Sequence, residues 1–279
     1  MNLFTPHAEF AKWDWYRTSV RPKSFEWDSV LLPAFIKQWP TACPREAAPN
    51  RPFAEGIEFV DLKDKRLMLL SRGGDHVKGV VQLQSTGSNA PDLKAVLDSC
   101  GLSHEPSRVD ACVDWFEDLL FDTLAQVFIQ YAKEKRLTIS TPGDWVRGEG
   151  RTLYVGSRSS PVMVRLYEKG FEERKKGDQD APLNWVRFEV EVKYKKAKQR
   201  QWVATLSPAD CFSIGWVHGL CERIMFSAKK IPAPSNYRSP DYDRALNHLI
   251  KQYGSVLARL AEECQSPQEF MDVLLDRAS

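Results

Sequence analysis

The chain of 279 residues lacks any long apolar run. A membrane-spanning helix needs roughly 18 or more consecutive apolar residues. Residues 1–15, MNLFTPHAEFAKWDW, also lack the basic start and apolar stretch of a signal peptide. These absences predict a cytoplasmic protein with no membrane association.

Paired metal-binding motifs are missing as well. The six cysteines form no CxxC pair, and the five histidines show no HxH or HExxH spacing. Disulfide frameworks and zinc sites depend on such clusters. The sequence therefore predicts reduced thiols and argues against a metal centre built from cysteine or histidine.

The chain also lacks a large net charge, which is only +2. Binding to phosphates depends on local clusters rather than on a global excess. One such cluster is the segment KYKKAKQRQW, in which Tyr194 and Trp202 accompany the basic residues Lys193, Lys195, Lys196, Lys198 and Arg200. Basic side chains beside aromatic ones are typical of surfaces that bind single-stranded nucleic acid. A solvated strand end and loop explains this segment equally well.

Apolar periodicity predicts an α+β fold, mainly an antiparallel sheet with helices packed on one face, plus a C-terminal helical segment. Strands are expected at 12–20, 56–62, 66–72, 78–87, 108–115, 136–140, 152–158, 162–170 and 184–195, and helices at 25–39, 91–100, 116–135 and beyond 207. We expect Ser24 to cap the first helix and residues 41–52 to form an irregular loop. Two prolines between residues 227 and 238 place a domain boundary there, giving an α+β domain at 1–235 and a helical appendage at 236–279.

Three predicted strands divide apolar from charged side chains in the same way. Because side chains alternate along a strand, Arg165, Tyr167 and Lys169 share one face of segment 162–170. The corresponding faces of the other two strands carry Arg108, Asp110, Cys112 and Asp114, and Arg187, Glu189, Glu191 and Lys193. A half-exposed sheet with cross-strand ion pairs is one interpretation. However, a solvent-exposed face without a function usually also contains Thr, Ser and Gln. The concentration of carboxylates, arginines and a tyrosine on these faces therefore favours a functional site.

The carboxylates suit a hard divalent cation such as Mg²⁺ or Mn²⁺. Asp110 and Asp114 lie roughly 13 Å apart along an extended strand, too far to share an ion, whereas Glu189 and Glu191 lie roughly 7 Å apart. One aspartate with one or both glutamates is therefore the expected ligand set. A tyrosine beside a metal and an arginine indicates nucleophilic catalysis. Nearby cations would offset part of the roughly 4 kcal/mol that separates its phenol from the phenolate at pH 7.

The segments RVDACVDW, GRTLYVGSRSSPVMVRLYEKG and WVRFEVEVK, in this order, resemble the replication initiation factor family, as does GVVQLQSTG upstream. Members of this family start rolling-circle replication of staphylococcal plasmids and filamentous phages, and related proteins are relaxases of conjugative elements. The resemblance implies a site-specific nicking and joining enzyme. Its tyrosine becomes joined to the 5′ phosphate of one DNA strand and leaves a 3′ hydroxyl for a polymerase, with a divalent metal and a host helicase assisting.

Carried over to this chain, the resemblance makes Tyr167 the nucleophile, with Arg165 and Lys169 as cations beside the phosphate. Asp110 and Glu189 become the leading metal ligands, and Glu191 and Asp114 are secondary candidates. Tyr154 is the rival nucleophile. A relaxase of the same chemistry and a non-cleaving DNA-binding regulator remain alternatives.

Overall fold

The computed structural model describes residues 10–21, 27–224 and 241–276. The chain divides into two compact units, Met1–Pro234 and Ser235–Ser279. The predicted domain boundary and Ser24 both lie outside the described residues. Within the described part, no helix is both long and apolar enough to cross a membrane.

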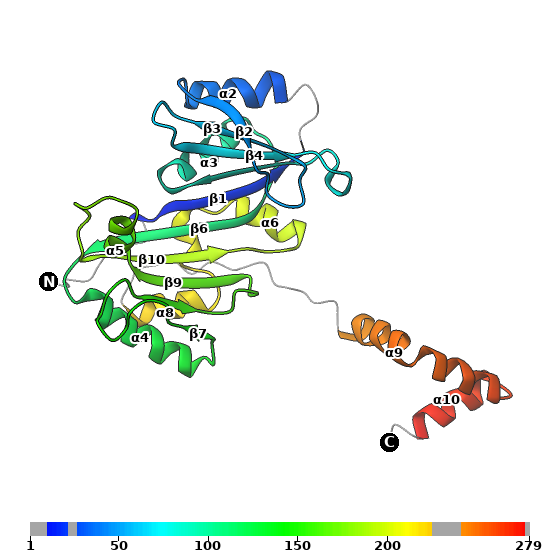
Figure 1. The fold of residues 1–279 in the computed structure, drawn as a ribbon. Coiled ribbons are helices and arrows are strands. Elements are labelled where there is room, and N and C mark those ends of the chain that lie inside the picture. Colours follow the sequence, from blue (N-terminus) through cyan, green and yellow to red (C-terminus); the bar gives the residue numbers. More distant parts are fainter. Residues whose placement is uncertain (1–9, 22–26, 225–240, 277–279) are drawn as a thin grey trace. The chain divides into compact units, whose positions relative to one another are not determined.

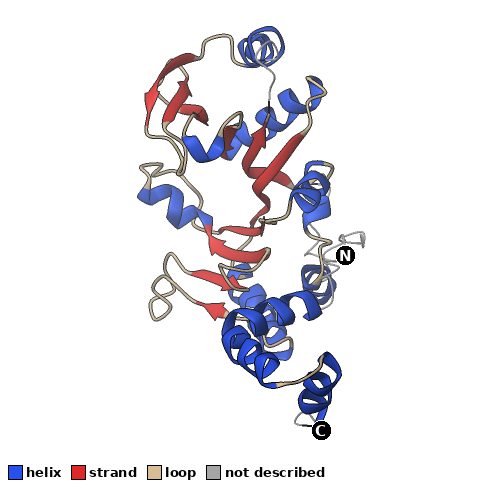
Figure 2. Cartoon of the chain, turned by 90° about the vertical axis from the view of Figure 1, so that its right-hand side faces the viewer, coloured by secondary structure: helices blue, strands red, loops and turns tan. Residues whose placement is uncertain are grey.

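The first unit is built on an antiparallel sheet (Figure 1), whose ten described strands follow the order β2-β3-β4-β5-β1-β6-β10-β9-β8-β7. In chain order they are β1 (Lys12–Val20), β2 (Cys43–Ala47), β3 (Glu55–Val60), β4 (Arg66–Arg72), β5 (Val81–Thr86), β6 (His104–Phe116), β7 (Ile139–Ser140), β8 (Thr152–Val155), β9 (Val162–Glu168) and β10 (Trp185–Val192). Figure 2 shows the strands running side by side through the unit with helices along them. The predicted α+β fold is confirmed.

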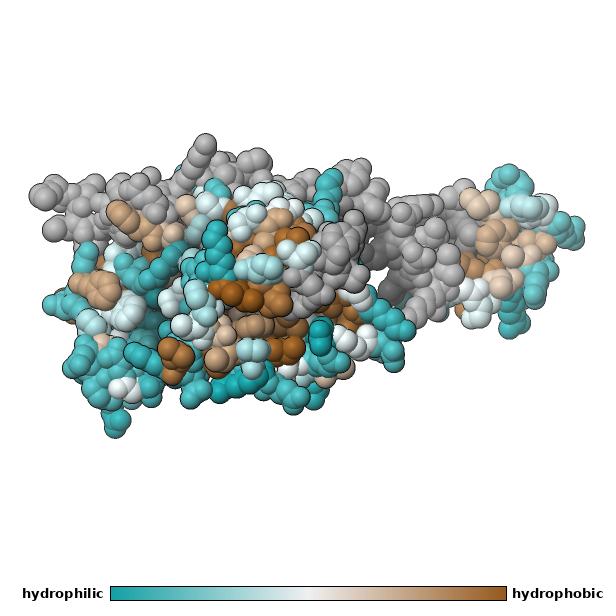
Figure 3. Space-filling view, turned by 90° about the horizontal axis from the view of Figure 1, so that it is seen from above, coloured by the Kyte–Doolittle hydropathy of each residue, from teal (hydrophilic) through white to brown (hydrophobic). Residues whose placement is uncertain are grey.

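The longer helices pack on the apolar face of the sheet. The helices of the first unit are η2 (Trp27–Leu31, a π-helix), α2 (Leu32–Gln38), α3 (Ala90–Ser99), α4 (Leu120–Glu134), α5 (Lys169–Lys175), α6 (Ala197–Ala204), α7 (Pro208–Cys211) and α8 (Trp216–Arg223), with short 3-10 turns at Asp75–Val77 and Gly87–Asn89. Phe188 of β10 shows how the layers meet, because its ring centroid lies 5.1 Å from that of Phe128 on α4 and 4.9 Å from that of Phe212 after α7. The core therefore fills the space between this face and the helices. Figure 3, which views the molecule from above, shows apolar side chains in the middle of the surface of this unit as well.

The second unit contains α9 (Asp241–Glu263) and α10 (Pro267–Asp276). Ser266 precedes α10, and its hydroxyl accepts a hydrogen bond from the backbone N–H of Glu269 at 3.2 Å, which caps the helix. Ser266 and Pro267 thus provide a typical start signal, and α10 falls within the region beyond residue 207 that was predicted to be helical.

Several elements differ from the sequence prediction. Residues 41–52, predicted as loop, contain β2, which tolerates Pro44 because it is the edge strand of the sheet. The single helix predicted over 207–226 is two helices, α7 and α8, separated at Gly215, whose φ is +53°. The hydrophilic segment 171–182, between the predicted strands 162–170 and 184–195, was assigned no element, yet α5 covers its first residues, and Lys169 forms ion pairs with Glu172 and Glu173 along this helix.

Candidate active site on the polar face of the sheet

The charged strand faces predicted from sequence belong to neighbouring strands. The register of β6, β10, β9 and β8 aligns their residues in three rows across the sheet. The first row holds Asp114, Arg187, Tyr167 and Thr152, the second holds Cys112, Glu189, Arg165 and Tyr154, and the third holds Asp110, Glu191 and Met163. Because partners within a row lie about 5 Å apart, the rows decide which groups can meet.

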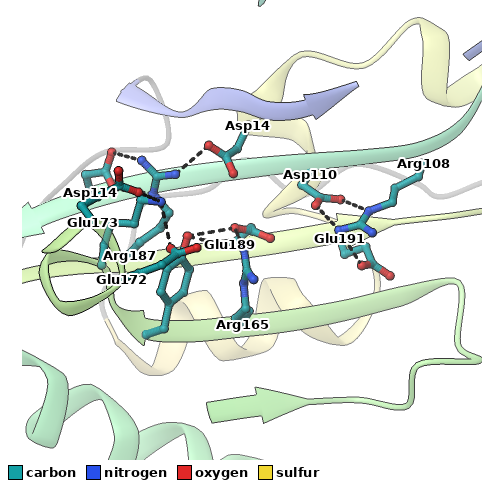
Figure 4. A network of polar contacts seen from close by, with 12 residues as sticks. Asp14, Arg108, Asp110, Asp114, Arg165, Glu172, Glu173, Arg187, Glu189 and Glu191 are labelled. Carbon is teal, nitrogen blue, oxygen red and sulfur yellow. Dashed lines mark hydrogen bonds and ion pairs between the residues drawn. The ribbon is translucent and has the colours of Figure 1, made fainter. Parts of the chain in front are cut away.

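Tyr167 lies beside Arg165 and Glu189, and Figure 4 shows these two side chains reaching toward each other from neighbouring strands. The Arg165 guanidinium carbon lies 4.3 Å from the centroid of the Tyr167 ring, and its Nη2 donates to Glu189 Oε2 at 2.6 Å. The same nitrogen lies 3.4 Å from the Tyr167 hydroxyl, which in turn lies 3.5 Å from Glu189 Oε2. The structure thus brings together three residues that the sequence assigned to one site.

The tyrosine is held as a phenol in this arrangement. Tyr167 is only 4% exposed, and burial raises the pKa of its hydroxyl, with the Glu189 carboxylate adding to the effect. The charges of Arg165 and Arg187 lower that pKa but do not outweigh burial. A phenol in this setting is a weak nucleophile, so any attack by this hydroxyl would require a change in its surroundings.

Lys169 was predicted to share the strand face with Arg165 and Tyr167, and this placement was wrong. The strand β9 ends at Glu168, so Lys169 is the first residue of α5. Its Nζ lies 2.9 Å from Glu172 Oε2 and 2.5 Å from Glu173 Oε1, and 5.8 Å from the centroid of the Tyr167 ring. Both ion pairs lie within α5, and the contact with the ring places the start of this helix beside the tyrosine.

Gly170 fixes the position of α5. A Cβ atom added at Gly170 would lie 1.8 Å from the carbonyl oxygen of Pro182, so only glycine allows the helix this close to the segment before β10. The helix then borders a groove of about 1000 Å³ along the polar face, lined among others by Trp15, Arg165, Tyr167 and Arg187.

Asp110 and Glu191 share one cation. The Arg108 Nη2 atom lies 2.5 Å from Asp110 Oδ2 and 3.1 Å from Glu191 Oε2. Burial raises the pKa of Asp110 to about 7, with Arg108 opposing the shift and the charges of Glu189 and Glu191 adding to it. Burial also raises the pKa of Glu189, which Arg165 opposes. Burial and mutual repulsion therefore disfavour the charged forms of these neighbouring carboxylates.

The carboxylate oxygens of Asp110, Glu189 and Glu191 are the type of ligand that a hard cation such as Mg²⁺ prefers. Asp110 and Glu191 face each other across neighbouring strands and already converge on a positively charged nitrogen. Glu189 lies in the next row and pairs with Arg165 instead. In the described part of the chain, no three His, Cys, Asp or Glu side chains are arranged as a ready cluster of metal ligands. The geometry therefore favours Asp110 with Glu191 as the pair that could hold Mg²⁺ or Mn²⁺.

Asp114, a secondary metal candidate, belongs to a separate network around Arg187. Arg187 donates to Asp114 from Nε at 2.6 Å and from Nη2 at 2.9 Å, and to Asp14 from Nη1 at 2.6 Å. Lys12 Nζ lies 2.7 Å from Asp114 Oδ2. Burial alone would raise the pKa of Asp114, but the hydrogen bonds from Arg187, Lys12 and Trp185 outweigh it and lower that pKa.

Asp14 and the role of Arg187 do not follow from the alternation pattern of the sequence. The strand β1 has a register irregularity between Trp13 and Trp15, and this is where Asp14 meets the polar face. Simple alternation along residues 12–20 does not reveal such a bulge. The only sequence signal for Arg187 was its place on the charged face of its strand.

Replacing Arg187 with methionine is expected to lower the free energy of unfolding by about 3 kcal/mol, because Asp14 and Asp114 lose their buried partner. Arg187 is 5% exposed in its side chain. The matched control is Arg223→Met, whose pair with Glu134 is 53% and 35% exposed and is expected to contribute less than about 1 kcal/mol. Urea unfolding measures both, and equal losses would contradict the assignment of a stabilising network to Arg187.

The predicted DNA-binding run divides into two groups. Lys195, Lys196 and Lys198 are exposed before and on α6. The strand β10 ends at Val192, before the predicted end at residue 195, and α6 lies where a loop was the alternative interpretation. Lys193 instead pairs with Glu191, and Arg200 donates to the carbonyl oxygen of Tyr194 at 3.0 Å. The rings of Tyr194 and Trp202 pack edge to face with centroids 6.0 Å apart, and Tyr194 is buried, so its ring offers no stacking surface.

The family model for replication initiation factors matches residues 107–214, well under half of the chain. This match confirms the predicted resemblance, and it includes all three rows of the polar face. Among solved structures, a rolling circle replication initiator protein from Geobacillus stearothermophilus is 17% identical, with a TM-score of 0.49 over 82% of this chain and 90% of that chain. The search of curated proteins gives no match.

Proposed function

We propose that this protein starts rolling-circle replication by nicking one DNA strand with Tyr167 as the nucleophile. The observation that carries the proposal is the contact of Tyr167 with Arg165 and Glu189 inside the segment that matches the replication initiation factors. The product would be a 5′-phosphotyrosine link and a free 3′ hydroxyl for a host polymerase, with a host helicase opening the duplex.

Arg165 is suited to hold the scissile phosphate. Its Nε is buried and has no hydrogen-bond acceptor among the described residues, while its Nη2 is shared between Glu189 and the Tyr167 hydroxyl. A phosphate oxygen would accept a hydrogen bond from this Nε. The positive charge of the guanidinium would then stabilise the phosphate next to the attacking hydroxyl. In the reaction, the Tyr167 oxygen forms a bond to phosphorus while the bond from phosphorus to the 3′ oxygen breaks. The phenolic proton passes to a base, and the 3′ oxygen takes up a proton from water to become the 3′ hydroxyl. Glu189, within 3.5 Å of the Tyr167 hydroxyl, is placed to receive the phenolic proton.

A divalent cation is part of the proposal. Asp110 and Glu191 would hold Mg²⁺ or Mn²⁺, and Glu189 is a further candidate. When bound, the cation would neutralise charge that develops on the phosphate in the transition state. Arg108 would then be free to contact the DNA backbone.

The direct test is incubation with Mg²⁺ or Mn²⁺ and supercoiled DNA that carries the replicon's own origin. The proposal requires open circles from this DNA and none from a plasmid without the origin. Equal relaxation of every plasmid would argue against origin-specific initiation.

The exposed lysines provide a separate prediction about DNA binding. Replacing Lys195, Lys196 and Lys198 together with alanine is expected to weaken duplex binding and to reduce the slope of log affinity against log salt by about one for each lysine that meets a phosphate. Fluorescence anisotropy across a salt series measures the slope. An unchanged slope would leave these lysines as a solvated surface.

A DNA-binding regulator that does not cleave is the second candidate. The burial of Tyr167 and the pairing of Asp110, Glu189 and Glu191 with arginines favour it. Such a protein would bind origin DNA, yet it would leave supercoiled DNA intact with either metal. A relaxase would nick as an initiator does, and a coupling ATPase encoded nearby would distinguish it.

A further inference from the structure

A second, smaller pocket lies on the other side of the Arg165 and Glu189 pair from the main groove. It has a volume of about 250 Å³ and is lined by Arg108, Tyr154, Arg158, Met163, Arg165, Glu189, Glu191 and Lys193. Four cations thus face two carboxylates, and the pocket has an excess of positive charge. Tyr154 forms one wall, in the same row as Arg165.

Arg158 differs from the other cations of this pocket. Arg108, Arg165 and Lys193 each pair with a carboxylate, whereas Arg158 has no ion pair among the described residues. Its guanidinium carbon instead lies 5.6 Å from the centroid of the Tyr154 ring, within the range of a cation–π contact. All the donors of this exposed guanidinium remain available to an anion.

The turn that carries Arg158 is well fixed. The backbone N–H of Gly156 donates to the carbonyl of Thr138 at 2.9 Å, and that of Ser160 to the carbonyl of Ser157 at 2.9 Å. The φ of Gly156 is +96°, and a Cβ there would come within 3.2 Å of the Val162 carbonyl oxygen and 3.3 Å of the Trp216 ring. Only glycine fits this conformation, which places Arg158 over the pocket.

We infer that this pocket binds a phosphodiester of single-stranded DNA, next to the one that Tyr167 attacks, through the Arg158 guanidinium that the Tyr154 ring positions. The inference rests on the proposed function. Tyr154 lies one strand away from Tyr167 and two residues along the register, roughly 8 Å in all. This separation is comparable with one nucleotide step of an extended strand. Tyr154 is then a positioning residue, and its ring, not its hydroxyl, is what the site uses.

The test measures binding of a fluorescein-labelled, mixed-sequence single-stranded 12-mer by anisotropy, in a Tyr167→Phe background so that no cleavage interferes. Arg158→Ala is expected to weaken binding about five- to tenfold and to reduce the salt slope by about 0.7, the value for one phosphate of a single strand. Tyr154→Phe keeps the ring and should match the parent. Tyr154→Leu should weaken binding about threefold, but it should have no further effect when Arg158 is already alanine.

The control is Arg147→Ala, because Arg147 is an exposed arginine on the preceding loop, with 79% of its side chain accessible. An effect of Arg158→Ala no larger than that of Arg147→Ala would overturn the inference. So would equal losses for Tyr154→Phe and Tyr154→Leu, since the ring would then not be the cause. Competition by inorganic phosphate at millimolar concentration as strong as by the oligonucleotide would identify the pocket as a free-phosphate site instead.

Failure of the proposed function gives a different pattern. If the protein with Tyr167 intact never nicks DNA but still loses affinity with Arg158→Ala, the pocket is a DNA site on a non-cleaving protein. If nicking occurs and Arg158→Ala leaves both affinity and salt slope unchanged, the inference about the pocket is wrong and the nicking function stands.

Discussion

Replacing Tyr167 with phenylalanine is expected to reduce nicking of supercoiled origin DNA by at least about three orders of magnitude, while origin binding stays within about twofold. The substitution removes one oxygen and keeps the ring that packs against Arg165. The chain thus loses its nucleophile without a cavity, and the stability change should be at most about 1 to 2 kcal/mol. Gel conversion of supercoiled to open circles, with anisotropy for binding, measures both quantities.

The matched control is Tyr154→Phe, which alters the other tyrosine facing this side of the sheet, one strand away. It is expected to nick at the parent rate. Residual nicking by Tyr167→Phe near the parent rate, or loss of nicking in Tyr154→Phe, would contradict the assignment of the nucleophile.

Removing the divalent cation is expected to have a similarly large effect. EDTA should abolish nicking, and Asp110→Asn should lower it at least about a hundredfold at a Mg²⁺ concentration that saturates the parent, because a hard cation then loses a charged oxygen ligand. Glu191→Gln should do the same if these two residues form the pair. Glu189→Gln should also impair nicking, since Glu189 is both a ligand candidate and the group nearest the Tyr167 hydroxyl.

A control separates loss of metal from loss of fold. Asp98→Asn changes an aspartate on α3 that is 52% exposed and pairs with Lys94, so it should leave activity unchanged. Near-UV circular dichroism should show that Asp110→Asn remains folded, and Mn²⁺ binding followed by electron paramagnetic resonance should show weaker affinity. Full activity of both Asp110→Asn and Glu189→Gln would exclude this metal site.

The alternation of side chains along each strand was enough to predict which residues of the candidate site share a strand face. Alternation placed Asp110, Tyr167 and Glu189 on one kind of face, and the antiparallel register then brought the three strands together. Alternation does not tell where a strand ends, so Lys169 was misplaced when β9 stopped at Glu168 and α5 began. Nor does it tell which rows align: the pairing of Asp110 with Glu191 rather than Glu189 depends on the register between β6 and β10.

Other features depended on tertiary contacts that sequence patterns do not encode. The edge strand β2 has little apolar alternation of its own and exists because β3 pairs with it. The Tyr194 ring was a candidate for stacking on bases, but it packs against Trp202 in the core. The contact of Arg158 with Tyr154 depends on a turn held by Gly156.

The measurement that tests the central claim most directly is mass spectrometry of the peptide that stays attached to a nicked origin oligonucleotide after proteolysis. The account predicts a single adduct, on the peptide containing Tyr167, with fragment ions that place the added 5′-phosphorylated nucleotide on that residue. An adduct on Tyr154 or on any other residue would contradict the account even if nicking itself were observed.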